Sequence, residues 1–103
     1  MTNEELIAIE TFCIHQEVET TFVLDLHERG LIHITVVNDK RFLVTDELPR
    51  IEQLARMHYD LDINPEGLEA ISHLLERMQE LQERMREMEL RVKMFDAEAD
   101  RQE

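Results

Sequence analysis

The first residues of this sequence that could do chemistry are Cys13 and His15, which form a Cys-x-His pair. Thiolate and imidazole both bind zinc, but a zinc site needs three or four ligands at supporting spacing. The chain has one cysteine and no His-x-x-x-His pair, so we expect no metal site and no internal disulfide. Cys13, beside Phe12, is expected to pack as a small apolar residue of the core.

A second cluster comprises His58, Tyr59, Asp60 and Asp62, whose side chains could act as acid, base or metal ligand. At positions i, i+1, i+2 and i+4 of a helix these side chains do not all face one way. No nucleophile, glycine-rich phosphate loop or Ser-His-Asp set accompanies them. We therefore expect no enzyme and no cofactor. His58 and Tyr59 are expected to pack and cap where the third and fourth helices meet. Asp60 and Asp62 are expected to be solvated or close to the N-terminus of the long helix, or else to join a partner surface.

Composition limits the partners of the protein. The 103 residues suit one domain plus an extension, and 11 Lys and Arg against 24 Asp and Glu give a net charge of −13. Such a charge repels nucleic acid and anionic membranes. The sequence has no apolar run near the roughly 20 residues that a membrane span needs, and its start, MTNEEL, is polar. We expect a cytoplasmic protein.

Short elements are predicted for the first two thirds of the chain: a brief strand over 5–9, helices over 10–16 and 20–29, strands over 31–37 and 41–44, and a third helix capped by Thr45 or Asp46. Gly30 is the expected stop of the second helix, and Pro49 fits the first turn of the third. Two helices separated by about three residues form a helix-turn-helix, with Val18 filling the angle between them. The hairpin that follows is a wing.

The third helix is predicted to turn one apolar face inward, formed by Ile51, Leu54, Ala55, Met57, His58 and Leu61. A fourth helix then has a clear start. Asn64 is a good N-cap, Pro65 suits the first helical position, and Glu66 places an acid near the positive helix end.

The fourth helix can continue to about Asp96, and its apolar residues repeat in strict heptads: Ile71, Leu74, Met78, Leu81, Met85, Met88, Val92 and Phe95. We call these eight residues the seam. About 30 helical residues extend roughly 45 Å, more than the roughly 33 Å diameter of a compact chain of this length. The predicted domains are therefore a winged helix-turn-helix over 1–63, a dimerisation helix over 64–97 and a disordered tail over 98–103.

The charges beside the seam favour a parallel homodimer over an antiparallel one. In a parallel pair Arg84 faces Glu89 of the other helix, and Arg91 faces Asp96. An antiparallel pair opposes arginines in some registers but joins Arg77 to Glu98 in another. The three methionines of the seam specify little, because an unbranched thioether packs adaptably. A helix that folds back on its own domain is the alternative.

The order of elements resembles the MerR-type winged helix-turn-helix, a mainly α fold with a small β-hairpin wing and here a long coiled-coil helix. Three segments carry a more specific resemblance, to the chaperone-modulator family called CbpM: Ile9-Glu10-Thr11-Phe12-Cys13-Ile14-His15, Leu26-His27-Glu28-Arg29-Gly30-Leu31-Ile32, and residues 51–64, IEQLARMHYDLDIN. The resemblance covers about residues 6–95.

This resemblance implies a regulator that binds the J-domain of a DnaJ-type co-chaperone such as CbpA. Binding would mask the surface that Hsp70 uses and so inhibit the co-chaperone. The Hsp70-docking helix of a J-domain is generally basic, which suits an acidic partner.

Charge separates this function from DNA reading. Between Glu17 and Arg29 the only cation is Arg29, and residues 1–64 hold five basic and thirteen acidic residues, a net −8. We expect partner binding through the acidic residues Glu19, Asp25, Glu28, Asp60 and Asp62. The long helix is an alternative docking surface. A MerR-like regulator that reads DNA with residues 20–29, with Lys40 and Arg41 on the backbone, and a dimerising adaptor remain alternatives.

Overall fold

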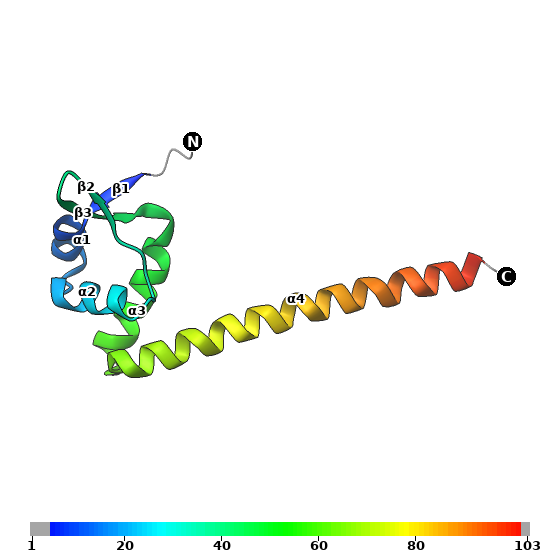
Figure 1. Ribbon diagram of the computed structural model, residues 1–103. Helices are drawn as coiled ribbons and strands as arrows, with labels where there is room; N and C mark the ends of the chain where they lie inside the picture. Colours follow the sequence, from blue (N-terminus) through cyan, green and yellow to red (C-terminus); the bar gives the residue numbers. More distant parts are fainter. Residues whose placement is uncertain (1–4, 102–103) are drawn as a thin grey trace. The chain divides into compact units, whose positions relative to one another are not determined.

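The computed structural model describes residues 5–101, and the chain divides into two units, 1–70 and 71–103. The first unit contains every strand of the described chain and all its helices but the greater part of the last (Figure 1). Its elements follow in chain order: β1 (Leu6–Ala8), α1 (Ile9–Gln16), α2 (Thr20–Glu28), β2 (Thr35–Val37), β3 (Lys40–Val44), a 3-10 turn (Thr45–Glu47), α3 (Leu48–Leu61) and the start of α4 (Pro65–Arg101). The predicted mainly α fold with a small sheet is confirmed.

The three strands form one antiparallel sheet in the order β1-β3-β2. Leu6 pairs with Val44 on one side of β3, and Thr35 pairs with Phe42 on the other. Asn38 and Asp39 connect β2 to β3 with φ angles of 51° and 62°. Two residues with positive φ suit the right-handed twist of a two-residue hairpin, so the wing is a tight one.

The predicted angle of the helix-turn-helix is confirmed. Glu17 ends α1 in the left-handed region at φ 54°, and Val18 donates its N–H to the carbonyl of Cys13 at 3.0 Å. This turns Val18 into the core, where 8% of it remains exposed. The buried core draws on every helix and on β3, and its fully covered members are Ile9, Val23, Leu26, Leu43, Ile51 and Leu68.

Three local predictions are wrong. The first strand of the wing begins at Thr35, because Leu31 and Ile32 enter the core as an irregular segment. Neither Thr45 nor Asp46 caps α3, since both lie in a 3-10 turn of their own, although Pro49 does occupy the first turn of α3. Leu61 is 66% exposed, because it is the last residue of α3 and lies where the chain leaves the core.

Gly30 ends α2 in a left-handed conformation, with φ of +76°. Leu31 then donates its N–H to the carbonyl of Leu26 at 2.9 Å, which satisfies the end of the helix. Replacing Gly30 with alanine is expected to lower the free energy of unfolding by about 1 kcal/mol, from strain alone, since a Cβ would meet no atom within 4 Å. Urea unfolding measures the loss. Gly30→Asn should lose less free energy of unfolding, because asparagine tolerates this conformation better. If Gly30→Ala were as stable as the parent protein, the account would be contradicted.

The predicted start of α4 is confirmed. Gly67 donates its N–H to Oδ1 of Asn64 at 2.8 Å, and Pro65 is the first helical residue. Helix α4 continues through residues 98–101, which were predicted as disordered tail, because Ala97, Glu98 and Ala99 are good helix formers and no breaker intervenes. Residues 102 and 103 lie outside the described range. No described helix is both long and apolar enough to cross a membrane.

Candidate partner-binding surface

The outward face of α2 is the surface that a helix-turn-helix would insert into DNA. Residues at i, i+3, i+4 and i+7 share a helix face. In α2 the outward face holds Thr21, Asp25 and Glu28, with Leu24 at its edge, packed against the core. Leu24 and Asp25 are half-buried, and Thr21 and Glu28 are exposed. This face has two carboxylates and no cation, so it repels phosphate.

Arg29, the cation next to this face, forms ion pairs with three carboxylates of the first unit. Its Nε lies 3.3 Å from Oδ1 of Asp25, its Nη2 lies 2.9 Å from Oε1 of Glu66, and its Nη1 lies 3.1 Å from Oε2 of Glu69. Desolvation lowers the pKa of Arg29, but the three carboxylates outweigh it and raise that pKa above its ordinary value. Three carboxylates around one guanidinium give this cluster a net negative charge, so it repels phosphate, and Asp25 is not a free charge.

Acidification is expected to weaken this cluster through Glu66. A hydrogen bond from its own backbone N–H and the nearby charge of Arg29 hold the pKa of Glu66 below its ordinary 4.5, against a smaller effect of burial. A carboxyl with a lowered folded pKa adds stability that is complete above its unfolded pKa and is lost as pH falls through the folded one.

The measurement is the midpoint of urea unfolding at pH about 7 and about 3, with Glu66→Gln as the comparison. Glu66→Gln should be less stable than the parent protein at neutral pH, and its free energy of unfolding should fall less on acidification. The same loss in both proteins would show that Glu66 does not couple to folding.

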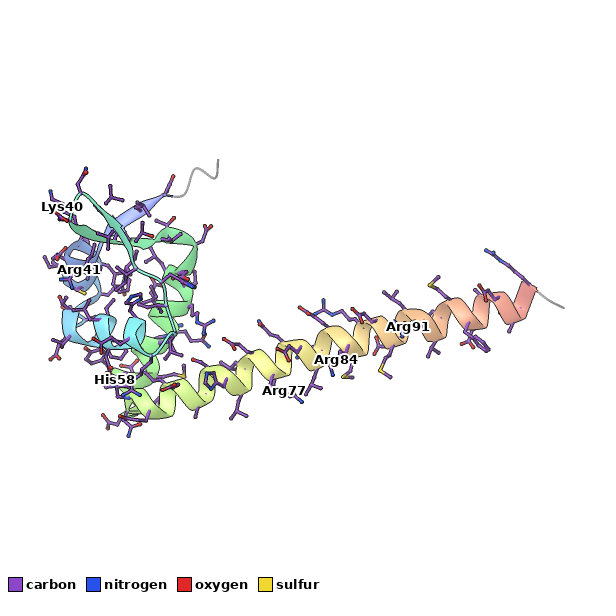
Figure 2. All side chains as sticks on the ribbon, viewed as in Figure 1. Lys40, Arg41, His58, Arg77, Arg84 and Arg91 are labelled. Atoms are coloured by element: carbon purple, nitrogen blue, oxygen red, sulfur yellow. The ribbon has the colours of Figure 1, made fainter. Side chains whose placement is uncertain are left out.

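The wing holds the two other cations that a DNA reader would use. Lys40 and Arg41 are exposed at the turn of the hairpin, on β3 and not on α2 (Figure 2). Asp39 and Glu10 border the same shallow groove as these two residues. Two cations beside two acids make a weak phosphate contact.

The structure separates the five acids predicted to bind a partner. Asp25 and Glu28 lie on the outward face of α2, whereas Glu19 precedes α2 and Asp60 lies near the end of α3, both exposed. Asp62 ends α3 with φ 56°, and the next N–H, of Ile63, donates to the carbonyl of Met57 at 3.2 Å. The exposed Asp62 thus sets the turn into α4 by its backbone.

An aromatic cluster, which the sequence did not reveal as a unit, joins α2 to α3. The rings of Phe22 and His58 stack with centroids 4.5 Å apart, and Tyr59 meets Phe22 edge-on at 5.5 Å. His58 Nδ1 lies 2.8 Å from the carbonyl oxygen of Ile63, and the backbone N–H of Glu19 donates to the Tyr59 hydroxyl at 3.1 Å. His58 meets the backbone between α3 and α4, where it was predicted to pack and cap. Tyr59 was predicted at the same junction but packs against α2 instead.

Cys13 is buried in the core, as predicted. Burial raises the pKa of its thiol, a hydrogen bond with Thr20 opposes this, and the Glu10 carboxylate raises the pKa further. The thiol therefore stays protonated and unreactive near neutral pH. Among residues 5–101 no three His, Cys, Asp or Glu side chains stand close enough to hold a metal ion.

The seam of α4 is uncovered along most of its length. Its residues from Leu74 to Phe95 are between 48% and 73% exposed. Arg77, Arg84 and Arg91 follow one another every seven residues beside it (Figure 2). Nη1 of Arg77 lies 3.9 Å from Oε2 of Glu80 on the same helix. Apolar residues outside the seam, Leu75, Leu90 and Met94, are exposed as well.

Comparison with known proteins places this architecture in a family. A family model described as MerR HTH family regulatory protein matches residues 7–90, which is most of the chain. The chain belongs to this family, and the matched residues include the helix-turn-helix of α1 and α2. No curated protein and no solved structure gives a significant match.

Proposed function

We propose that this protein is a chaperone modulator that binds the J-domain of a DnaJ-type co-chaperone and masks the surface that Hsp70 uses. The observation that carries the proposal is that the outward face of α2 is unsuited to binding DNA. Where a DNA reader presents cations, this chain presents Asp25 and Glu28, and its one nearby cation, Arg29, is bound by three carboxylates. The resemblance of residues 6–95 to the CbpM family supports a J-domain as the partner.

The electrostatics of the first unit support a basic protein partner. Acids outnumber bases by thirteen to five in residues 1–64, and such a field speeds encounter with a cationic surface and repels nucleic acid. The basic Hsp70-docking helix of a J-domain matches it. A complex on that helix would exclude Hsp70 by steric overlap, and no chemical step is needed.

The proposed active form is a homodimer joined through α4. Each large apolar side chain that pairing buries contributes about 1.5–3 kcal/mol, and seven seam residues from Leu74 onward are largely exposed in a single chain. In a parallel pair Arg84 meets Glu89 and Arg91 meets Asp96 of the second copy.

Titration calorimetry of the full-length protein against the purified J-domain from the same genome tests the proposal. At low salt we expect micromolar or tighter binding. Raising the salt should weaken it several-fold, because screening removes the long-range attraction. A duplex DNA of mixed sequence, titrated in the same buffers, should not bind. Absence of J-domain binding together with salt-sensitive DNA binding would replace the proposal with a DNA-reading function.

A further inference from the structure

A second surface of the first unit lies around Val18, at the turn between α1 and α2. Two shallow grooves meet at this residue. One is bordered by Glu10, Ile14 and Glu19, and the other by Glu17, Glu52, Tyr59 and Asp60. We call these residues, with Val18, the turn-side surface. Glu28, at the far end of α2, does not belong to it.

The centre of the turn-side surface is apolar. Helix α1 directs Ile9, Phe12 and Cys13 into the core at positions i, i+3 and i+4, so Ile14 falls outside that stripe and is 76% exposed. Tyr59 is 41% exposed on the other side of Val18. An isoleucine that is mostly exposed adds little to the stability of the fold, and its burial by a partner would be favourable.

Tyr59 is held in place before any partner arrives. Phe22 and His58 both meet its ring edge-on, at centroid distances of 5.5 Å and 4.8 Å. Its hydroxyl accepts a hydrogen bond from the Glu19 N–H at 3.1 Å, which leaves the hydroxyl proton free to be donated. A rigid, half-exposed tyrosine loses little entropy on binding.

The rim of the surface is acidic, and its members are Glu10, Glu17, Glu19, Glu52 and Asp60, against the single cation Arg56. An apolar centre with an acidic rim is the complement of an amphipathic helix that carries apolar residues between cations. The same rim disfavours nucleic acid and anionic lipid.

We infer that the turn-side surface docks one basic amphipathic helix, with an apolar side chain between Ile14 and Tyr59 and cations against Glu19 and Asp60. The inference rests on the proposed function, in which that helix is the basic, Hsp70-docking helix of the J-domain. It places the complex at the turn of the helix-turn-helix, away from the outward face of α2.

Calorimetry of full-length variants against the J-domain tests the location. Ile14→Ser should weaken binding roughly 10-fold or more, because the buried apolar contact is lost. Asp60→Lys should weaken it about 5-fold or more at low salt and less at high salt. Both positions are exposed, so thermal unfolding of the variants should match that of the parent. Glu28→Lys, the matched control, makes the same charge change nine residues and roughly 13 Å from Glu19, and should cost less than about 2-fold.

The outcomes are distinct. If the parent protein binds and Ile14→Ser and Asp60→Lys bind equally well, the docking site is elsewhere and the inference is overturned while the proposed function stands. If Glu28→Lys loses more affinity than Asp60→Lys, the outward face of α2 is the site and the inference is again overturned. If Ile14→Ser changes only the self-association of the protein, the surface joins copies of this chain. If the parent does not bind any J-domain of the organism, the proposed function and this inference fall together.

Discussion

Replacing Leu81 and Met85 together with glutamate is expected to abolish the proposed homodimer. The two residues are 48% and 59% exposed in a single chain, and pairing through the seam would bury both. A carboxylate buried without a partner costs about 3 kcal/mol or more, which corresponds to a more than ~100-fold weaker association. Sedimentation equilibrium over a range of protein concentrations measures the strength of this association.

The matched control is Gln79→Glu with Ala97→Glu, which adds the same charge on the face of α4 away from the seam. These variants should remain dimeric, with association weakened by less than about 10-fold, since both positions stay near solvent. Full dimerisation of the Leu81 and Met85 double variant would show that the seam is not the interface. A parent protein that is monomeric at all concentrations would exclude the homodimer itself.

Replacing Leu26 with alanine is expected to cost 2–5 kcal/mol of folding stability, about the range for deleting a fully buried leucine side chain. Leu26 has no exposed surface, and its carbonyl also accepts the N–H of Leu31 at the end of α2. A domain of this size has only about 5–15 kcal/mol to lose, so a large unfolded fraction is expected near body temperature.

Leu24→Ala on the same helix is the comparison for Leu26→Ala. Leu24 is half-buried at the edge of the core. Leu24→Ala should therefore lose less than half as much folding stability as Leu26→Ala. Thermal and urea unfolding followed by circular dichroism measure both variants. Equal losses at the two positions would contradict the assignment of the core face of α2.

Features with local causes were predictable from the sequence. Asn64 and Pro65 define the start of α4 through their own side chains, and Gly30 ends α2 because it tolerates a positive φ. Val18 could be assigned to the helix-turn-helix angle because two predicted helices left only three residues between them. These signals act within a few residues, so no knowledge of tertiary packing is required.

Features that join distant residues were not predictable. Arg29 reaches Glu66 and Glu69, which lie 37 and 40 residues further along the chain. The pair between Asp25 and Arg29 differs from these contacts, because it joins residues i and i+4 of one helical segment and the sequence spacing could have shown it. The contact between Tyr59 and Glu19, which builds part of the turn-side surface, also spans 40 residues.

One signal for the turn-side surface was present in the sequence. Ile9, Phe12 and Cys13 define a helical stripe that excludes Ile14, which predicts an exposed isoleucine on α1. The grooves beside it could not be foreseen, because they depend on how α3 packs against the turn.

The steady-state ATPase activity of Hsp70, stimulated by the J-domain protein, tests the central claim most directly. With co-chaperone and Hsp70 held constant, increasing amounts of this protein should return the rate to that of Hsp70 alone, and excess Hsp70 should restore stimulation because the two compete for one surface. A stimulated rate that stays unchanged at saturating amounts of this protein would contradict masking of the Hsp70-docking surface.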